Sequence, residues 1–125
     1  MRFLLLAIFA STLWSQQPKP PILPEDPPEE DESLKPKEYV LNPLQAQKEW
    51  RTGNFYFKKG TWKAAASRYK EATLWDPSYA DAFLKLGETY DRMKLRKEAS
   101  EAYAKYVELE PDSKRAAELK RRLKR

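Results

Sequence analysis

The sequence predicts an all-α solenoid fragment, built from two helical hairpins and a C-terminal capping helix. When the chain is aligned with itself at an offset of 34 residues, several identical residues coincide, and five of these pairs mark the repeat. The pairs are Gly53 and Gly87, Tyr56 and Tyr90, Ala65 and Ala99, Tyr69 and Tyr103, and Pro77 and Pro111. A period of this length is typical of helical hairpins that stack on copies of themselves. The small residues let the two helices of a hairpin approach closely, and the tyrosines fill the space between turns.

Four helices are expected within and around the two repeats, which span residues 46–79 and 80–113. Their expected ranges are Pro43–Lys58, Trp62–Trp75, Tyr79–Arg92 and Arg96–Glu110. Asn42, Thr61 and Ser78 precede three of these helices and are suited to the N-cap, because their side-chain oxygens accept hydrogen bonds from free backbone N–H groups. Gly60 and the turn at 93–95 separate the paired helices.

The last helix of the prediction, residues 114–125, caps the array. Ala116, Leu119 and Leu123 recur at helical spacing and form one apolar face. A repeat array needs a terminal helix with one polar face to cover its last hydrophobic seam. The domain is therefore expected to span residues 42–125. Because two repeats with a cap are close to the smallest stable array, self-association is a further expectation.

With Ala46 and Ala80 as first positions, the repeated residues fall at positions 8, 11, 20 and 32 of each unit. In this register, residues 46–125 resemble two tetratricopeptide (TPR) repeats. The resemblance implies a right-handed superhelix whose inner groove is formed mainly by the first helix of each repeat. It also implies binding of a protein or peptide partner rather than catalysis.

The resemblance places ten residues on the inner groove, and these are the candidate partner-binding residues. They are Gln47, Trp50, Asn54, Phe57, Lys58, Asp81, Leu84, Glu88, Asp91 and Arg92. Trp50, Phe57 and Leu84 would form an apolar patch beside mixed charges, which suits a peptide or a partner helix. The alternative is that these side chains pack against the preceding linker, the start of the domain or a second copy of the chain. The clamp that some TPR domains use for a terminal carboxylate is incomplete, since Trp50 and Leu119 replace two of its basic residues.

Two segments precede the domain. Residues 1–15 combine Arg2 with the apolar run 3–10 and then small and polar residues, which is the layout of a secretory signal peptide. The run is shorter than the roughly 20 apolar residues of a membrane span. An apolar core helix of a cytosolic protein is the alternative. Since the chain has no Cys for a lipid anchor, we expect a periplasmic or secreted protein.

Residues 16–41 form a proline-rich acidic linker with seven of the ten prolines. Such a stretch buries too little apolar surface to offset the entropy of ordering, so it is expected to be disordered. The linker has a net charge of −4, whereas residues 42–125 have a net charge of +8. It either shields the basic domain or acts as a spacer. Tyr39, Val40 and Leu41 at its end could dock on the domain.

Composition argues against catalysis. The 125 residues include no Cys and no His, which excludes thiolate and imidazole metal sites, a Cys nucleophile and a Ser-His-Asp triad. Glu88 and Asp91 lie one turn apart, but two carboxylates on one open helix are too few to hold a cation. Three glycines leave no Gly-rich phosphate loop. We therefore expect no enzyme activity, no metal and no cofactor.

A basic cap is the second candidate surface. It consists of Lys114, Arg115, Lys120, Arg121, Arg122, Lys124 and Arg125. It is either a solvated helix face that interacts favourably with its own helix dipole or a contact for an anionic membrane surface. Nucleic acid is not expected, because no aromatic residues interleave the cluster and export separates the protein from it.

Two functions follow. The first is an exported, non-catalytic scaffold that binds a protein partner in the bacterial cell envelope. Residues 53–69 also resemble the opening repeat of the TPR lipoprotein in the outer-membrane β-barrel assembly machine, which implies a link to outer-membrane protein assembly. The second is a self-associating structural module held to an anionic membrane surface by its basic C-terminal helix.

Overall fold

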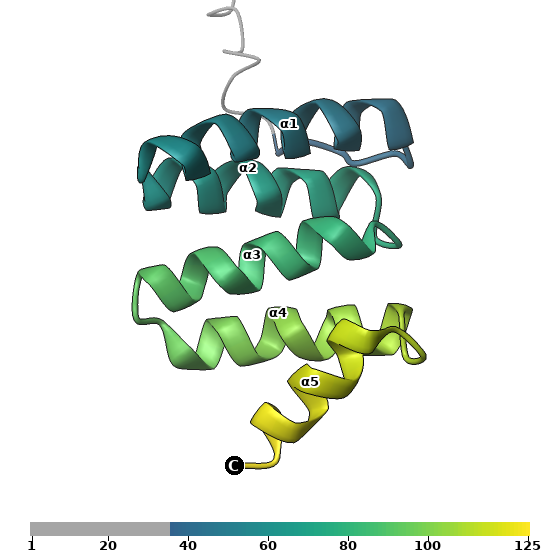
Figure 1. Ribbon diagram of the computed structural model, residues 1–125. Coiled ribbons are helices and arrows are strands. Elements are labelled where there is room, and N and C mark those ends of the chain that lie inside the picture. Colours follow the sequence, from purple (N-terminus) through teal and green to yellow (C-terminus); the bar gives the residue numbers. More distant parts are fainter. Residues whose placement is uncertain (1–35) are drawn as a thin grey trace, which may run out of the picture. The chain divides into compact units, whose positions relative to one another are not determined.

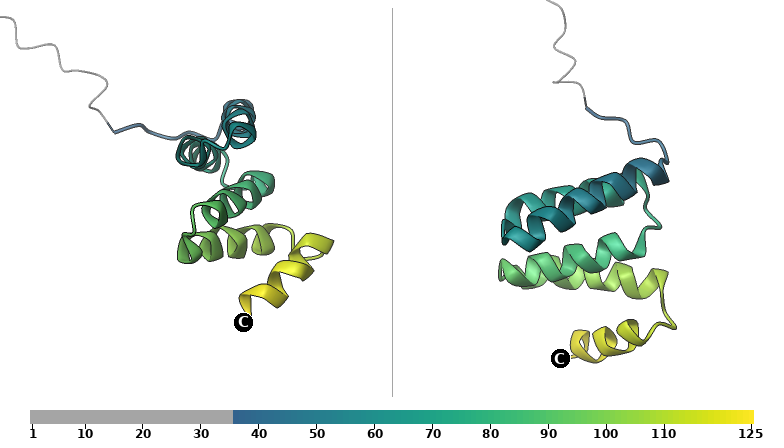
Figure 2. Two further views of the ribbon diagram at one scale, coloured as in Figure 1. Left: turned by 60° about the vertical axis from the view of Figure 1, so that its left-hand side comes forward. Right: turned by 45° about the horizontal axis from the view of Figure 1, so that its top comes forward.

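The computed structural model describes residues 36–125, whose compact unit is Lys37–Arg125. Its helices are α1 (Pro43–Lys59), α2 (Trp62–Trp75), α3 (Ala80–Arg92), α4 (Arg96–Leu109) and α5 (Lys114–Leu123). Figure 1 shows two antiparallel hairpins, α1 with α2 and α3 with α4, stacked on each other, and α5 crossing the outer side of α4. Figure 2 shows the same order of layers from two other directions. The all-α prediction is confirmed, with each helix boundary within two residues of its expected position.

Of the predicted N-caps, only Asn42 acts as one. Its side-chain oxygen accepts a hydrogen bond of 3.1 Å from the backbone N–H of Gln45, and Pro43 occupies the first helical position. Thr61 holds the N-cap position of α2 without a side-chain hydrogen bond. The prediction for Ser78 is wrong, because the turn before α3 is organised by Asp76, whose carboxylate accepts from both the backbone N–H and the hydroxyl of Ser78. As a result α3 begins one residue later than expected.

Each hairpin is closed by a glycine against a buried tyrosine. A Cβ atom added at Gly53 would lie 2.6 Å from the ring of Tyr69, and one added at Gly87 would lie 2.6 Å from the ring of Tyr103. Both tyrosines are buried, as are Ala65 and Ala99 in the second helix of each hairpin. The repeated small residues therefore have the role that the sequence predicts: they allow a close helix–helix approach that a larger side chain would prevent.

Helix α5 covers the last hydrophobic seam. Ala116 and Leu119 are buried against a cluster that includes Tyr103 and Tyr106, whereas Leu123 at the end of the helix stays 37% exposed. Ser113 is the N-cap of the helix, because its hydroxyl accepts a hydrogen bond of 3.0 Å from the backbone N–H of Ala116. The predicted capping role is confirmed, although the helix ends at Leu123 and not at residue 125.

The segment before α1 contacts α2 mainly through Tyr39, and the Lys37 ammonium group lies 4.0 Å from the Glu71 carboxylate. The Tyr39 ring lies edge-on to Trp75, with 4.9 Å between centroids, and its hydroxyl donates a 2.9 Å hydrogen bond to Glu71. The backbone N–H of Asn42 then donates to the Trp75 carbonyl at 2.9 Å. Val40 and Leu41 are exposed. Of these three residues, which could either dock on the domain or stay free, only Tyr39 docks.

The predicted signal peptide, residues 1–15, and most of the predicted linker, residues 16–41, lie outside the described part of the chain. Among the helices of residues 36–125, none has the length and apolar character that crossing a membrane requires.

Candidate functional site

The first helices of the two hairpins border a hollow of about 510 Å³. Its lining residues are Trp50, Asn54, Phe57 and Lys58 from α1 and Lys85 from α3. The four α1 residues share one helix face, because Asn54 follows Trp50 by four residues and Phe57 follows Asn54 by three, which is about one turn in each case. Lys58 is adjacent to Phe57 and lies one turn after Asn54. Four of the ten predicted groove residues are thus brought together in one place.

Lys85 is the member of this site that the sequence did not predict. Its ammonium group lies 3.8 Å from the centre of the Phe57 ring and 3.3 Å from a carboxylate oxygen of Glu88. A cation over an aromatic face is attracted by the negative ring surface, so Lys85 is held at the apolar floor of the hollow. The sequence feature that could have indicated Lys85 is its three-residue spacing from Glu88, since this spacing places an ion pair on one face of α3.

Trp50 belongs more to the packed interior than to an open groove. It is half-buried, packs against the core cluster around Tyr69 and lies 6.0 Å from Tyr79 between ring centroids. Its indole nitrogen is fully buried and has no hydrogen-bond acceptor among the described residues. Trp50 therefore contributes to stability as well as to the wall of the hollow.

Asn54 is oriented by the hairpin core beneath it. The Tyr69 hydroxyl donates a 2.5 Å hydrogen bond to its side-chain oxygen. Burial, with a smaller effect of Glu88, raises the pKa of the Tyr69 hydroxyl, so it stays a neutral donor. Because the Asn54 oxygen is the acceptor, its amide N–H groups are donors that can serve a ligand.

Two of the three acidic residues predicted for the groove, Glu88 and Asp91, contact α5. Arg122 makes a two-pronged contact with the Asp91 carboxylate at 2.7 Å for each oxygen, and Arg115 approaches Glu88 at 3.7 Å. Burial by itself raises the pKa of Asp91, but hydrogen bonds from Arg122 and Tyr103 outweigh it and lower this pKa below its ordinary value. These two carboxylates are therefore part of the contact between α3 and the cap.

The other predicted groove residues are dispersed. Gln47 lines a separate small hollow at the start of α1, and Asp81 is exposed. Leu84 packs against the cluster that α5 covers, so it does not form one apolar patch with Trp50 and Phe57. Arg92 lies over the ring of Trp62, with 5.4 Å from its guanidinium carbon to the centroid. The resemblance to TPR repeats predicted which helices face the groove, and the packing of the helices decides which of these side chains line the hollow.

The basic cap is partly engaged within the chain. Besides Arg115 and Arg122, Lys120 donates to the Pro111 carbonyl at 3.0 Å and Arg121 to the Ala117 carbonyl at 3.4 Å. Lys114, Lys124 and Arg125 are exposed. The cap therefore contacts the groove helix α3 as well as solvent, a role that the sequence did not predict.

The arrangement is suited to binding. It offers an aromatic floor, two lysines and an oriented amide, and residues 36–125 contain no group of three acidic, His or Cys side chains that could hold a metal. The 34-residue hairpins, the glycine–tyrosine contacts and the capping helix together define the fold. A tetratricopeptide-repeat family model matches residues 56–123, more than half of the chain. The chain belongs to the tetratricopeptide repeat family.

A solved structure supports the same conclusion. The TPR chain is 32% identical to MamA in its crystal structure, with a TM-score of 0.58. The match covers 64% of this chain and 47% of the MamA chain, so this chain spans less than half of that protein's length. No curated protein sequence matches this chain. The comparisons confirm the TPR assignment and the all-α solenoid, and they show no relation to the outer-membrane assembly lipoprotein.

Proposed function

We propose that this TPR protein is a non-catalytic scaffold that binds a protein partner through the hollow between α1 and α3. The observation that carries the proposal is the hollow itself, about 510 Å³ in volume, with Phe57 at its floor and Lys58 and Lys85 beside it. An apolar side chain of the partner would fill the space next to Phe57 and Trp50. Carboxylates or carbonyls of the partner would meet the two lysines and the Asn54 amide.

The site of action we propose is the cell envelope. The support is the order of Arg2, the apolar run 3–10 and the small polar residues that follow, which is typical of an export signal. The resemblance of residues 53–69 to the opening repeat of the outer-membrane assembly lipoprotein supports a partner from that machinery. Membership of a family of interaction modules supports the scaffold role itself.

The test is crosslinking in the native cell with a C-terminally tagged full chain, followed by mass spectrometry of the captured proteins. The decisive variant is Lys58→Glu, because Lys58 is exposed and lines the hollow. Its matched control is Lys59→Glu, since Lys59 is the exposed neighbour that lies over Phe55 and does not line the hollow. Trp50→Ala is tested in parallel, with circular dichroism, because this side chain also packs in the core.

Capture of envelope proteins that Lys58→Glu abolishes and Lys59→Glu retains would support the proposal. Equal capture by both variants would contradict the groove assignment. Recovery of cytosolic proteins alone would contradict the envelope assignment. Capture of outer-membrane assembly proteins in particular would support the proposed link to outer-membrane protein assembly.

The second candidate function is attachment to an anionic membrane surface through the basic cap. The exposed Lys114, Lys124 and Arg125 favour it, whereas the pairing of Arg115 and Arg122 with Glu88 and Asp91 reduces the charge that the cap presents. Binding of the chain to phosphatidylglycerol vesicles should then fall steeply as salt rises, because charge attraction to headgroups is screened. Partner capture at the hollow should fall less steeply with salt, because salt does not screen its apolar contacts with Phe57 and Trp50.

A further inference from the structure

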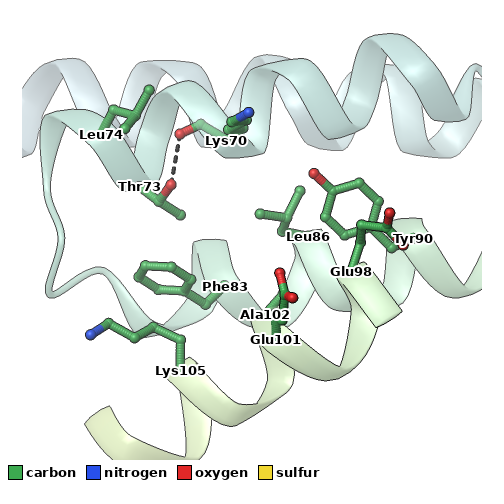
Figure 3. Close-up of a pocket in the computed structure, with 10 residues that line it drawn as sticks. All are labelled: Lys70, Thr73, Leu74, Phe83, Leu86, Tyr90, Glu98, Glu101, Ala102 and Lys105. Atoms are coloured by element: carbon green, nitrogen blue, oxygen red, sulfur yellow. Dashed lines mark hydrogen bonds between the residues drawn. The ribbon is translucent and has the colours of Figure 1, made fainter. Parts of the chain in front are cut away.

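A second hollow, of about 470 Å³, lies between α2, α3 and α4 and shares no lining residue with the first. Its floor is largely apolar and is formed by Phe83, Leu86, Tyr90 and Ala102, and Leu74 lies on the α2 rim. Figure 3 shows α2 along one rim and α4 along the other, with the α3 side chains between them. Phe83, Leu86 and Tyr90 recur at helical spacing on a face of α3 that does not include Lys85. This surface is thus independent of the proposed partner site.

The hollow combines a mostly buried floor with an exposed leucine at its rim. Leu86 and Ala102 are 6% exposed, whereas Leu74 on the α2 rim is 40% exposed. Thr73, which also lines the hollow, donates its hydroxyl hydrogen bond within α2 to the Lys70 carbonyl at 2.7 Å. An exposed leucine beside an apolar hollow is a surface that burial against another apolar surface would stabilise.

The two rims have opposite charge. Lys70 projects from the α2 rim, and Glu101 projects from the α4 rim across the hollow (Figure 3). Both side chains are exposed, and neither forms an ion pair within residues 36–125. Glu98 adds a second negative charge to the α4 rim. Lys105, which also lies on that rim, is paired with Glu108 at 3.5 Å.

We propose that a second copy of this chain covers the hollow, related by a two-fold axis that runs along it. Such an axis exchanges the rims, so Lys70 of each copy meets Glu101 of the other. A face that carries a positive rim, an apolar floor and a negative rim is complementary to itself in this orientation. The same contact buries Leu74 of both copies. The resulting homodimer leaves the hollow at Trp50 and Phe57 open to a partner.

The experiment measures the mass of the full chain in solution by sedimentation equilibrium. The variants are Lys70→Glu, Glu101→Lys, the two combined in one chain, and a mixture of the two single variants. Lys63→Glu is the control, because Lys63 is an exposed lysine of α2 that does not line the hollow. All variants keep the same N-terminal residues, so association through that segment affects them equally. Circular dichroism checks that each variant is as helical as the unmodified chain.

We expect the unmodified chain and the control to be dimers. Each single variant places two pairs of like charges in the interface, so its dimer dissociation constant should rise by at least about tenfold. The combined variant and the equimolar mixture should both recover dimers, the mixture as heterodimers, because opposite charges face each other again. That reciprocal rescue is specific to a two-fold contact between these rims.

Three results would overturn the proposal. The first is an unmodified chain that stays monomeric up to about 1 mM, which would leave the hollow to a different protein or to solvent. The second is a dimer that neither single variant weakens, which would mean that another surface forms it. The third is weakening by the single variants without rescue in the mixture, which would exclude the two-fold pairing. None of these results depends on the hollow at Trp50 and Phe57.

Discussion

The Arg122 guanidinium donates two hydrogen bonds of 2.7 Å to the carboxylate of Asp91, which lies 31 residues earlier in the sequence. The Tyr103 hydroxyl donates a third hydrogen bond to the same carboxylate at 2.6 Å, and the Arg122 guanidinium lies over the Tyr103 ring. One carboxylate of α3 thereby joins side chains from α4 and α5. The contact fixes the capping helix on the second hairpin, because a two-pronged arginine–carboxylate pair has a defined geometry.

Replacement of Asp91 should cost more stability than replacement of Arg122. Asp91→Ala removes the acceptor of both Arg122 and Tyr103, and it leaves a buried tyrosine hydroxyl without its partner, so we expect a loss of about 1–2 kcal/mol. Arg122→Met leaves the Tyr103 hydrogen bond intact and removes a half-exposed pair, for which we expect below about 1 kcal/mol. Urea unfolding of both variants measures the difference. An equal loss would show that the Tyr103 hydrogen bond adds nothing.

The contribution of Asp91 should also depend on pH. Its pKa in the folded protein is lowered from the ordinary value of 3.8. A group of this kind stabilises the fold fully above its unfolded pKa, and the stabilisation is lost as pH falls through the lower, folded value. The difference in unfolding free energy between the unmodified chain and Asp91→Asn should be constant near neutral pH and shrink below 3.8. A difference that does not change in acid would contradict this role for the carboxylate.

A single methyl group should disrupt the second hairpin. Gly→Ala in an exposed helix interior usually stabilises by about 1 kcal/mol. At Gly87 the new Cβ would lie 2.6 Å from the Tyr103 ring, so we expect Gly87→Ala to destabilise instead, by about 1–3 kcal/mol. The sign of the change in thermal or urea unfolding is the test. The double variant with Tyr103→Leu should recover part of the loss, whereas a strictly additive double variant would contradict a direct clash.

The Tyr39 contact should stabilise the start of the domain. Tyr39→Ala removes the edge-on contact with Trp75 and the hydrogen bond to Glu71, and we expect a loss of about 1–2 kcal/mol. Hydrogen exchange at the Asn42 amide, which donates to the Trp75 carbonyl, should become faster. Val40→Ala is the control, because Val40 is 72% exposed and should change neither measurement. Unchanged exchange in Tyr39→Ala would show that the segment is held by the α1 cap alone.

The sequence by itself determined the repeat, the helices and the cap. The pairs Gly53 with Tyr69 and Gly87 with Tyr103 are visible as a 34-residue period, because close helix packing needs a small residue opposite a large one at a fixed spacing. The resemblance to TPR repeats likewise placed Trp50, Asn54, Phe57 and Lys58 on the groove side of the first helix. These are local properties, set by a rise and a turn per residue that every helix shares.

Only the tertiary structure decided how the charged residues are used. Arg122 and Asp91 are far apart in the chain, and nothing in their spacing indicates that α5 turns its basic side toward α3. The same holds for Lys70 and Glu101, whose opposition across the hollow follows from the stacking of α2 on α3 and α3 on α4. Long charged side chains reach partners by rotation about several bonds, so their pairing is fixed by the packing of the helices and not by sequence period.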